Sequence, residues 1–365
     1  MRDVGEDILE LVMIPSVTGD EGALADHLTA RLARGRFASS YEIVRLGDSI
    51  VVRSASAARR PVIVFAGHTD TVPLAECGPP RRAGGEIQGR GAADMKAGLA
   101  VMLRLLEEIE PSRAFADLAF VFYTGEEGAS DQNALASILE SQPWLTKSAL
   151  AILCEPTSGA LELGCQGSIH LEVELQGVAC HSARPWLGRH ALRDALPWLS
   201  ELFSRPTRDI ELAGVQFREV VSVTNLRAGD ARNVIPGTAR VNVNLRYPPD
   251  RTFDDAEQFA LSLAPDRSIG VAEIVDHAPA GSIPSDDPYY AHLLSSTGLP
   301  RRAKQAWTDV ARFSSVGVPA LNWGPGDPGV AHTRDERVAI DEAQRCLDAM
   351  TRYLTGPGPG PGSVR

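Results

Sequence analysis

Three short apolar runs in the first half of the chain each end at a polar or charged motif. The runs are Val62–Ala66, Leu118–Phe122 and Ala149–Leu153. Runs of this length, bounded by turn-forming residues, are typical of strands buried on both faces of a parallel sheet. The first is followed by G-H-T-D, the second by Y-T-G-E-E-G and the third by C-E-P-T. Because ligands of open α/β sheets bind outside the carboxyl ends of the strands, we expect these motifs to meet in one crevice.

The N-terminal segment alternates between helical and strand-like patterns. The apolar spacing over residues 3–34 predicts two amphipathic helices around the turn I-P-S-V-T-G-D-E, with Thr18 or Asp20 as the cap of the second helix. The β-branched content rises over Ile43–Arg53, which predicts a strand region. Residues 74–90 are rich in proline, glycine and arginine and are predicted to form a loop.

Two further helices and a terminal tail follow from the pattern. The string G-R-G-A-A-D-M-K-A-G is a polar turn that leads into a strongly apolar helix, which ends before Pro111. The last helix is expected from about Asp341 to Leu354. The low-complexity segment 356–365 is predicted to be disordered.

The pattern changes in the second half of the chain, where polar and apolar residues alternate. This alternation covers Ser168–Gln176, residues 221–227 and Val241–Tyr247, and helical patterns over His190–Phe203 and Asp254–Leu263 separate the three segments. Strands with a period of two have one covered face, which is typical of an antiparallel sheet. We therefore predict an α/β fold with a mixed, mostly parallel sheet over 1–166 and 278–355, interrupted by an α+β domain with an antiparallel sheet over 167–277.

Composition narrows the possible function. A chain of 365 residues is long enough for two domains, and a net charge of −11 argues against a nucleic-acid partner. The first residues carry no basic segment followed by an apolar one, and no apolar run reaches the length of a membrane span, so neither a secretory signal nor membrane insertion is expected. Five cysteines without a C-x-x-C pair indicate reduced thiols, which favours a cytoplasmic protein. They are Cys77, Cys154, Cys165, Cys180 and Cys346.

The polar motifs supply imidazole and carboxylate groups. The candidates are His68, Asp70, Asp94, Glu126, Glu127, Glu155 and His332. Each has an ordinary alternative on its own: a polar turn, a helix N-terminus or a surface loop. Taken together, two histidines and three carboxylates suit divalent metals such as zinc, and five ligands with one of them bridging suffice for two metal ions. Glu126, next to a metal ligand, is placed to take a proton from water.

The motifs G-H-T-D-T-V-P, G-R-G-A-A-D-M-K-A-G, G-E-E-G, C-E-P-T and A-H-T-R-D-E resemble the signature of the M20 metallopeptidase and aminoacylase family. The resemblance implies a zinc-exopeptidase-like catalytic domain with two Zn2+ ions, for which Co2+ or Mn2+ are possible substitutes. It implies His68, Asp94 and Glu155 around one zinc, with Asp94 bridging, and Glu127 and His332 around the other. It further implies that Asp70 orients His68 and that Glu126 is the general base and later the general acid.

Within that family, L-G-C-Q-G-S, H-S-A-R-P-W-L-G, R-N-V-I-P, N-L-R-Y and W-T-D-V-A-R-F are similar to succinyl-diaminopimelate desuccinylases of the actinobacterial type. This implies hydrolysis of N-succinyl-LL-2,6-diaminopimelate in lysine biosynthesis, and a homodimer formed through the lid at 167–277. His181, from the partner subunit, would stabilise the oxyanion. Asn233, Arg246 and Thr308 would contact the substrate. Arg246 shares one strand face with two asparagines, which suits capture of a carboxylate.

Other functions remain open at this point. The same metal motifs occur in acetylornithine deacetylases, in enzymes that release an amine from a carrier protein, in aminoacylases and in dipeptidases, and a paralogue from a specialised biosynthetic pathway would look similar. A non-catalytic scaffold protein is a different class of function. It predicts loss of a metal ligand or of the base, whereas all six residues are present here.

Overall fold

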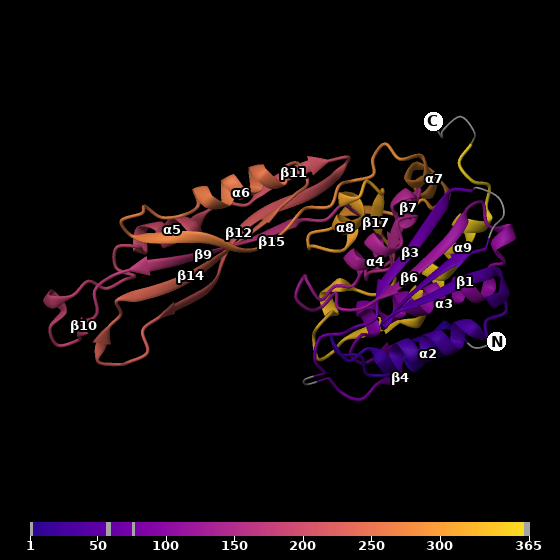
Figure 1. Ribbon diagram of the computed structural model, residues 1–365, viewed down its shortest axis with the longest axis horizontal. Helices are drawn as coiled ribbons and strands as arrows, with labels where there is room; N and C mark the ends of the chain where they lie inside the picture. Colours follow the sequence, from indigo (N-terminus) through magenta and orange to yellow (C-terminus); the bar gives the residue numbers. More distant parts are fainter. Residues whose placement is uncertain (1–2, 56–59, 75–76, 361–365) are drawn as a thin grey trace. The chain divides into compact units, whose positions relative to one another are not determined.

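The computed structural model describes residues 3–55, 60–74 and 77–360, and the chain divides into two compact units (Figure 1). The first unit comprises Met1–Gly164, Ser282–Arg302 and Arg312–Arg365. The second unit comprises Cys165–Gly281 and Ala303–Ala311. Ala303–Ala311 were predicted to belong to the catalytic domain, because nothing in the local sequence pattern marks a return to the other unit. The catalytic and lid roles of the two units stay predictions.

The first unit is built on an eight-stranded sheet with the order β1-β2-β6-β3-β7-β17-β8-β16. Its strands are β1 (Tyr41–Leu46), β2 (Ser49–Ser54), β3 (Val62–His68), β6 (Asp117–Tyr123), β7 (Leu150–Leu153), β8 (Leu161–Leu163), β16 (Arg301–Ala303) and β17 (Ala320–Asn322). The four central strands β6, β3, β7 and β17 run parallel, and antiparallel pairs flank them. The predicted α/β fold with a mixed sheet is confirmed.

The three apolar runs form neighbouring parallel strands. Val64 of β3 pairs with Ala119 of β6 on one side and with Ala151 of β7 on the other. Every residue of β6 and β7 is buried, as the continuous apolar pattern predicted. Because the strands are parallel and adjacent, the motifs after them emerge at one edge of the sheet.

Helices surround this sheet, as the labelled ribbon in Figure 1 shows. They are α1 (Val4–Val12), α2 (Gly22–Ala33), α3 (Ala97–Glu108), α4 (Leu135–Ser141), α7 (Pro288–Thr297), α8 (Val310–Ser315) and α9 (Ile340–Thr355). Helix α3 packs against α1 and α9, which explains why its residues from Ala97 to Leu106 are all buried. Every helix in the described part of the chain is too short or too polar to cross a bilayer.

Two local predictions in this unit were wrong. The residue that precedes α2 is Glu21, and neither Thr18 nor Asp20 caps the helix. Thr18 instead donates its hydroxyl proton to Asp70 (2.9 Å), a partner 52 residues away. Residues 74–90 were predicted to form a loop, but they contain β4 (Arg81–Ala83) and β5 (Glu86–Gln88). These strands pair with each other, and β5 also pairs with β18 (Arg337–Ala339), which lies far away in the sequence.

The second unit contains a five-stranded antiparallel sheet with the order β11-β12-β14-β9-β15. Its strands are β9 (Gly167–Gln176), β11 (Arg208–Leu212), β12 (Val215–Ala228), β14 (Thr238–Tyr247) and β15 (Gly270–Ala278), and its helices are α5 (Leu196–Ser204) and α6 (Phe253–Ser262). The apolar face of β9 and β14 packs against α5 to form the core. The structure therefore confirms the predicted antiparallel sheet and adds the edge strands β11 and β15, whose patterns are weaker.

Two boundaries differ from the prediction. Helix α5 begins at Leu196, whereas the pattern predicted a start at His190, because Pro197 in the first turn favours a helix start there. The tail 356–365 was predicted to be disordered. The structure describes it as far as Gly360, with Gly358 against Phe115, and residues 361–365 lie outside the described part of the chain.

Candidate metal centre

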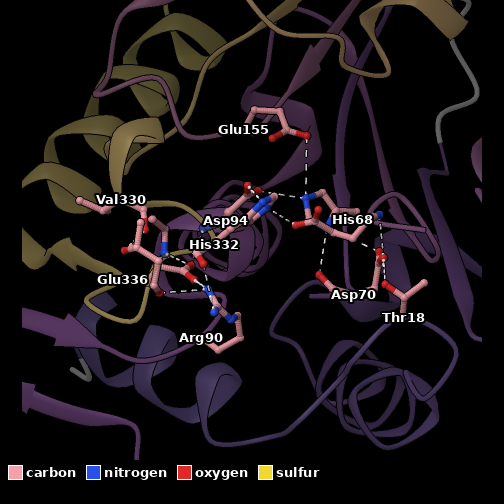
Figure 2. Close-up of polar contacts among 12 residues, drawn as sticks. Thr18, His68, Asp70, Arg90, Asp94, Glu155, Val330, His332 and Glu336 are labelled. Atoms are coloured by element: carbon pink, nitrogen blue, oxygen red, sulfur yellow. Dashed lines mark hydrogen bonds and ion pairs between the residues drawn. The ribbon is translucent and has the colours of Figure 1, made fainter. Parts of the chain in front are cut away.

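His68 is the last residue of β3, and its side chain is buried at the carboxyl edge of the sheet. Its Nε2 lies 3.1 Å from Asp94 Oδ1 and 4.0 Å from Glu155 Oε1. Its Nδ1 faces Asp70, at 3.0 Å from the backbone carbonyl and 3.5 Å from Oδ1. One ring nitrogen therefore points at two carboxylates while the other is held in place by Asp70 (Figure 2).

Asp94 lies between the two histidines. Its Oδ1 faces His68, and its Oδ2 lies 3.3 Å from Nε2 of His332, as Figure 2 shows. Burial alone would raise the pKa of this carboxyl group, but hydrogen bonds with His332 and His68 more than offset that effect and hold its pKa below the usual range. A carboxylate with one oxygen directed at each of two imidazoles has the geometry that a bridging metal ligand needs.

The second imidazole has its own carboxylate neighbour. His332 Nε2 lies 2.8 Å from Glu127 Oε1, and hydrogen bonds with Asp94 and Glu127 raise the pKa of His332 to about 10. Ligand atoms of His68, Asp94 and Glu127 lie within 4.8 Å of one another. The five candidate ligands are therefore close together, with one acidic residue beside each histidine and Asp94 between them.

Glu155 follows β7 after one residue, Cys154, and its position depends on a glycine in α3. A Cβ atom at Gly98 would lie 2.1 Å from the carbonyl oxygen of Cys154, which is impossible without moving the backbone. The glycine lets the start of α3 pack against the end of β7, so Glu155 lies beside His68.

Asp70 holds the G-E-E-G turn as well as His68. Its Oδ1 accepts the backbone N–H of Glu126 (3.1 Å), and its Oδ2 accepts the N–H of Glu127 (2.9 Å) and the hydroxyl of Thr18. Burial would raise its pKa, but the interactions with His68 and these donors lower the pKa to about 2. Glu126 is half-buried in the same turn, which Gly125 permits with a φ of 79°.

Three residues of this centre had been given no role in the site from the sequence. Thr18 donates to Asp70, and Arg90 and Glu336 form a buried ion pair (2.7 Å) between the Asp94 and His332 segments. Arg90 and Glu336 stand within the motifs G-R-G and A-H-T-R-D-E, so the sequence motifs already contained both residues. Their partners are backbone groups of distant segments, which a sequence pattern does not reveal.

His181 and Asn233 come together in the second unit. His181 ends the short strand β10 (Cys180–His181) and pairs with Val234 of β13 (Val234–Ile235). The N–H of Ser182 donates to the carbonyl of Asn233 (2.9 Å). The side chains of His181 and Asn233 are exposed.

Arg246 and Thr308 lie at the other end of this unit. Arg246 pairs with Ser168 at the start of β9, and its Nε donates to Asn244 Oδ1 (3.0 Å), so the predicted shared face is confirmed. Burial lowers the pKa of Arg246. Thr308 is buried, and its hydroxyl has no hydrogen-bond partner within the described residues. The carbonyl of Thr308 accepts from Cys165 (3.5 Å), close to the start of β9.

The donor set of the first unit fits divalent metal ions. Imidazole and carboxylate groups are the ligands that zinc and similar ions accept in sites that keep a position open for water or substrate. The hydrogen bond from Nδ1 of His68 to the Asp70 carbonyl leaves Nε2 as the metal-facing nitrogen, which is the usual arrangement around a ligating histidine.

Comparisons with known proteins agree with this geometry. The profile described as peptidase family M20/M25/M40 matches residues 64–356. A putative succinyl-diaminopimelate desuccinylase of Mycobacterium tuberculosis is 39% identical over 98% of this chain and 100% of its own length. The succinyl-diaminopimelate desuccinylase of Corynebacterium glutamicum is 35% identical over 94% of each chain.

Solved structures show the same fold at low identity. Aminopeptidase PepT from Bacillus cereus superposes with a TM-score of 0.76 at 15% identity, covering 97% of each chain. A dinuclear metal-binding M20 peptidase of Bacillus subtilis superposes with a TM-score of 0.68 at 14% identity, covering 96% of each chain.

Proposed function

This chain belongs to peptidase family M20/M25/M40 and is a metal-dependent amide hydrolase, and from that premise we propose that it hydrolyses N-succinyl-LL-2,6-diaminopimelate. The products are succinate and LL-2,6-diaminopimelate, as in lysine biosynthesis in the cytoplasm. The observation that carries the two-metal reaction is the position of Asp94 between His68 and His332. The desuccinylase relatives, which match nearly the whole chain, support the choice of substrate.

We assign the first metal position to His68, Asp94 and Glu155, and the second to Asp94, Glu127 and His332. Zinc suits these donors, and cobalt or manganese would accept the same set. When bound, the ions would polarise the amide carbonyl and acidify a water molecule.

Glu126 is the proposed proton carrier. It removes a proton from the attacking water, whose oxygen forms the new carboxylate of succinate, and it delivers that proton to the amide nitrogen as the C–N bond breaks. Asp70 supports this role because it binds the backbone N–H of Glu126 and so fixes the turn.

The variant Glu126→Gln tests this role. It should bind metal normally and lose at least about 100-fold in kcat. Glu140→Gln, on the exposed side of α4, is the matched control. Near wild-type turnover in metal-loaded Glu126→Gln would refute the assignment.

Arg246 is the proposed contact for a substrate carboxylate. It stands on the rigid strand β14, where Asn244 orients its guanidinium group. The planar fork of arginine matches a carboxylate with two parallel hydrogen bonds. Asn233 and Thr308 are the further proposed contacts, Thr308 through its buried hydroxyl group.

His181 is proposed to act on the substrate bound by a second copy of the chain. His181 follows the far end of β9, whereas Arg246 pairs with its beginning, and ten residues of strand span about 33 Å. A diaminopimelate derivative is much shorter, so one unit alone does not present both side chains to it. This separation supports the proposed homodimer through the second unit.

Mixed dimers test the proposed dimer directly. His181→Ala and Glu126→Gln homodimers should both be inactive. A heterodimer of the two has one complete site if His181 acts across the interface and should recover about half of wild-type activity. No recovery in isolated heterodimers would show that His181 acts within its own chain, and an active His181→Ala homodimer would show that His181 has no role in the reaction.

A substrate panel separates this proposal from its alternatives. The zinc-loaded protein should have its highest kcat/KM for N-succinyl-LL-2,6-diaminopimelate, compared with N-acetylornithine, other N-acyl amino acids and dipeptides. A preference for an acetylated or dipeptide substrate would overturn the substrate assignment and leave the metal-dependent hydrolase intact.

A further inference from the structure

We infer that Arg90 and Glu336 form a positioning pair that sets the distance between Asp94 and His332, and thereby the affinity of the second metal position. This inference rests on the two-metal centre of the proposed function. It concerns two side chains that do not themselves contact the proposed ions.

Glu336 fixes the Asp94 side of the centre. It is 1% exposed, and its Oε1 accepts the backbone N–H groups of both Ala93 and Asp94, each at 3.1 Å. Its Oε2 accepts from Arg90 Nη1 at 2.7 Å. Hydrogen bonds to a buried charged acceptor are about twice as strong as neutral ones, so the backbone of the bridging residue is firmly anchored.

Arg90 fixes the His332 side. Its Nη2 donates to the carbonyl of His332 (3.3 Å), its Nη1 to that of Thr333 (3.2 Å), and its Nε to that of Pro73 (3.3 Å). Figure 2 shows the guanidinium group and Glu336 beside the backbone of His332. The pair therefore connects the backbones of the two residues whose side chains meet at 3.3 Å in the centre.

The two metal positions depend on this pair to different degrees. His68 stands at the end of a central strand, so the sheet itself holds it in place. His332 lies in a loop with a positive φ of 62°, and its side chain is 49% exposed. Asp94 belongs to both positions, but a loop ligand needs outside support more than a strand ligand does, so loss of the pair should weaken the second position more than the first.

Two variants disturb the pair mildly. Glu336→Gln keeps the shape and one acceptor oxygen, but it loses the negative charge that faces Arg90. Arg90→Lys keeps the positive charge but has only three donors and no planar fork, so it cannot replace all four hydrogen bonds of Arg90, to Glu336 and to the carbonyls of Pro73, His332 and Thr333. We expect each to weaken the binding of the second metal ion by about 10- to 100-fold, the usual effect of losing support around a ligand, and to weaken the binding of the first ion less.

Arg60→Lys is the matched control. Arg60 also donates to one carboxylate, Asp117 (2.9 Å), and to two carbonyls, those of Ala114 and Pro111. It lies in the same unit at the opposite end of β6 from the centre. A purely structural ion pair should behave like this control and lower the unfolding temperature without changing metal binding.

Equilibrium dialysis against buffered zinc measures the metal content per chain and so resolves the affinities of the two metal positions. The visible absorption of cobalt-loaded protein is an independent measurement of occupancy at the second position. The inference is supported if wild type and Arg60→Lys bind two ions per chain while both pair variants bind one ion at the same free zinc concentration. Equal weakening of both ions, or unchanged binding in Arg90→Lys and Glu336→Gln, would overturn it. If wild type binds fewer than two ions, the two-metal proposal fails and this inference fails with it. If wild type binds two ions without desuccinylase activity, only the substrate assignment fails.

Discussion

Replacing Asp70 with asparagine removes one negative charge from the metal centre and leaves the shape of the side chain unchanged. Asp70 is fully buried, and its carboxylate accepts the N–H groups of Glu126 and Glu127 and the hydroxyl of Thr18. An asparagine has one acceptor oxygen, so its NH2 group must face either the N–H of Glu126 and Nδ1 of His68 or the N–H of Glu127 and the hydroxyl of Thr18. The variant therefore loses at least one hydrogen bond to a charged acceptor, and its neutral side chain no longer stabilises a protonated His68.

The cost follows from the pKa of Asp70. Interactions in the folded, metal-free chain lower this pKa from 3.8 to about 2, which corresponds to roughly 2.5 kcal/mol of folding free energy at about 1.4 kcal/mol per pKa unit. A carboxyl group with a lowered pKa stabilises the fold fully above its unfolded pKa, and that stabilisation disappears as the pH falls through the folded pKa. The stability difference between wild type and Asp70→Asn should thus be largest above pH 4 and shrink toward pH 2.

Urea unfolding in the presence of a chelator, between pH 3 and pH 7, measures this difference. With metal added, Asp70→Asn should keep most of its metal and lose about 10- to 100-fold in kcat, because Asp70 is proposed to orient the ligand His68 and not to bind metal itself. Asp117→Asn, a buried carboxylate at the opposite end of the sheet, controls for general destabilisation. Loss of all metal from Asp70→Asn, or wild-type turnover, would refute the reasoning.

Three further predictions test other parts of the structure. Gly98→Ala forces a Cβ to within 2.1 Å of the Cys154 carbonyl oxygen, so it should cost about 1–3 kcal/mol of folding free energy and reduce metal content. Gly78→Ala is the control and should be neutral, because nothing lies within 4 Å of a Cβ there. Equal thermal unfolding curves for the two variants would contradict this prediction. His332, with a pKa of about 10 in the metal-free chain, is protonated at pH 8, so zinc loading should release about one proton more from wild type than from His332→Ala in a weakly buffered titration. Arg246→Lys should raise KM for the succinylated substrate by roughly 10-fold at unchanged metal content, and metal loss in this variant would place Arg246 in a different role.

The sequence by itself determined the buried central strands, the main antiparallel strands, the motifs and the chemistry of the donor set. Continuous apolar runs produced the buried strands β3, β6 and β7, and alternating runs produced the antiparallel sheet of the second unit. These features are local, because side-chain periodicity reports which faces of an element are covered. The spacing of His68 from Asp70 and the position of Glu155 two residues after a strand were also predictable, since each depends only on neighbouring residues.

Tertiary structure alone decided which groups hold the centre together. Asp94 lies between two imidazoles because a turn 26 residues after His68 and a loop 238 residues after Asp94 meet there. The Arg90–Glu336 pair and the hydrogen bond from Thr18 to Asp70 likewise join segments distant in the sequence. Such contacts form between backbone and side-chain groups brought together by the sheet, so no local pattern encodes them. For the same reason, the sequence motifs supplied the candidate ligands and Asp70, whereas the contacts of Thr18, Arg90 and Glu336 appeared only in the structure.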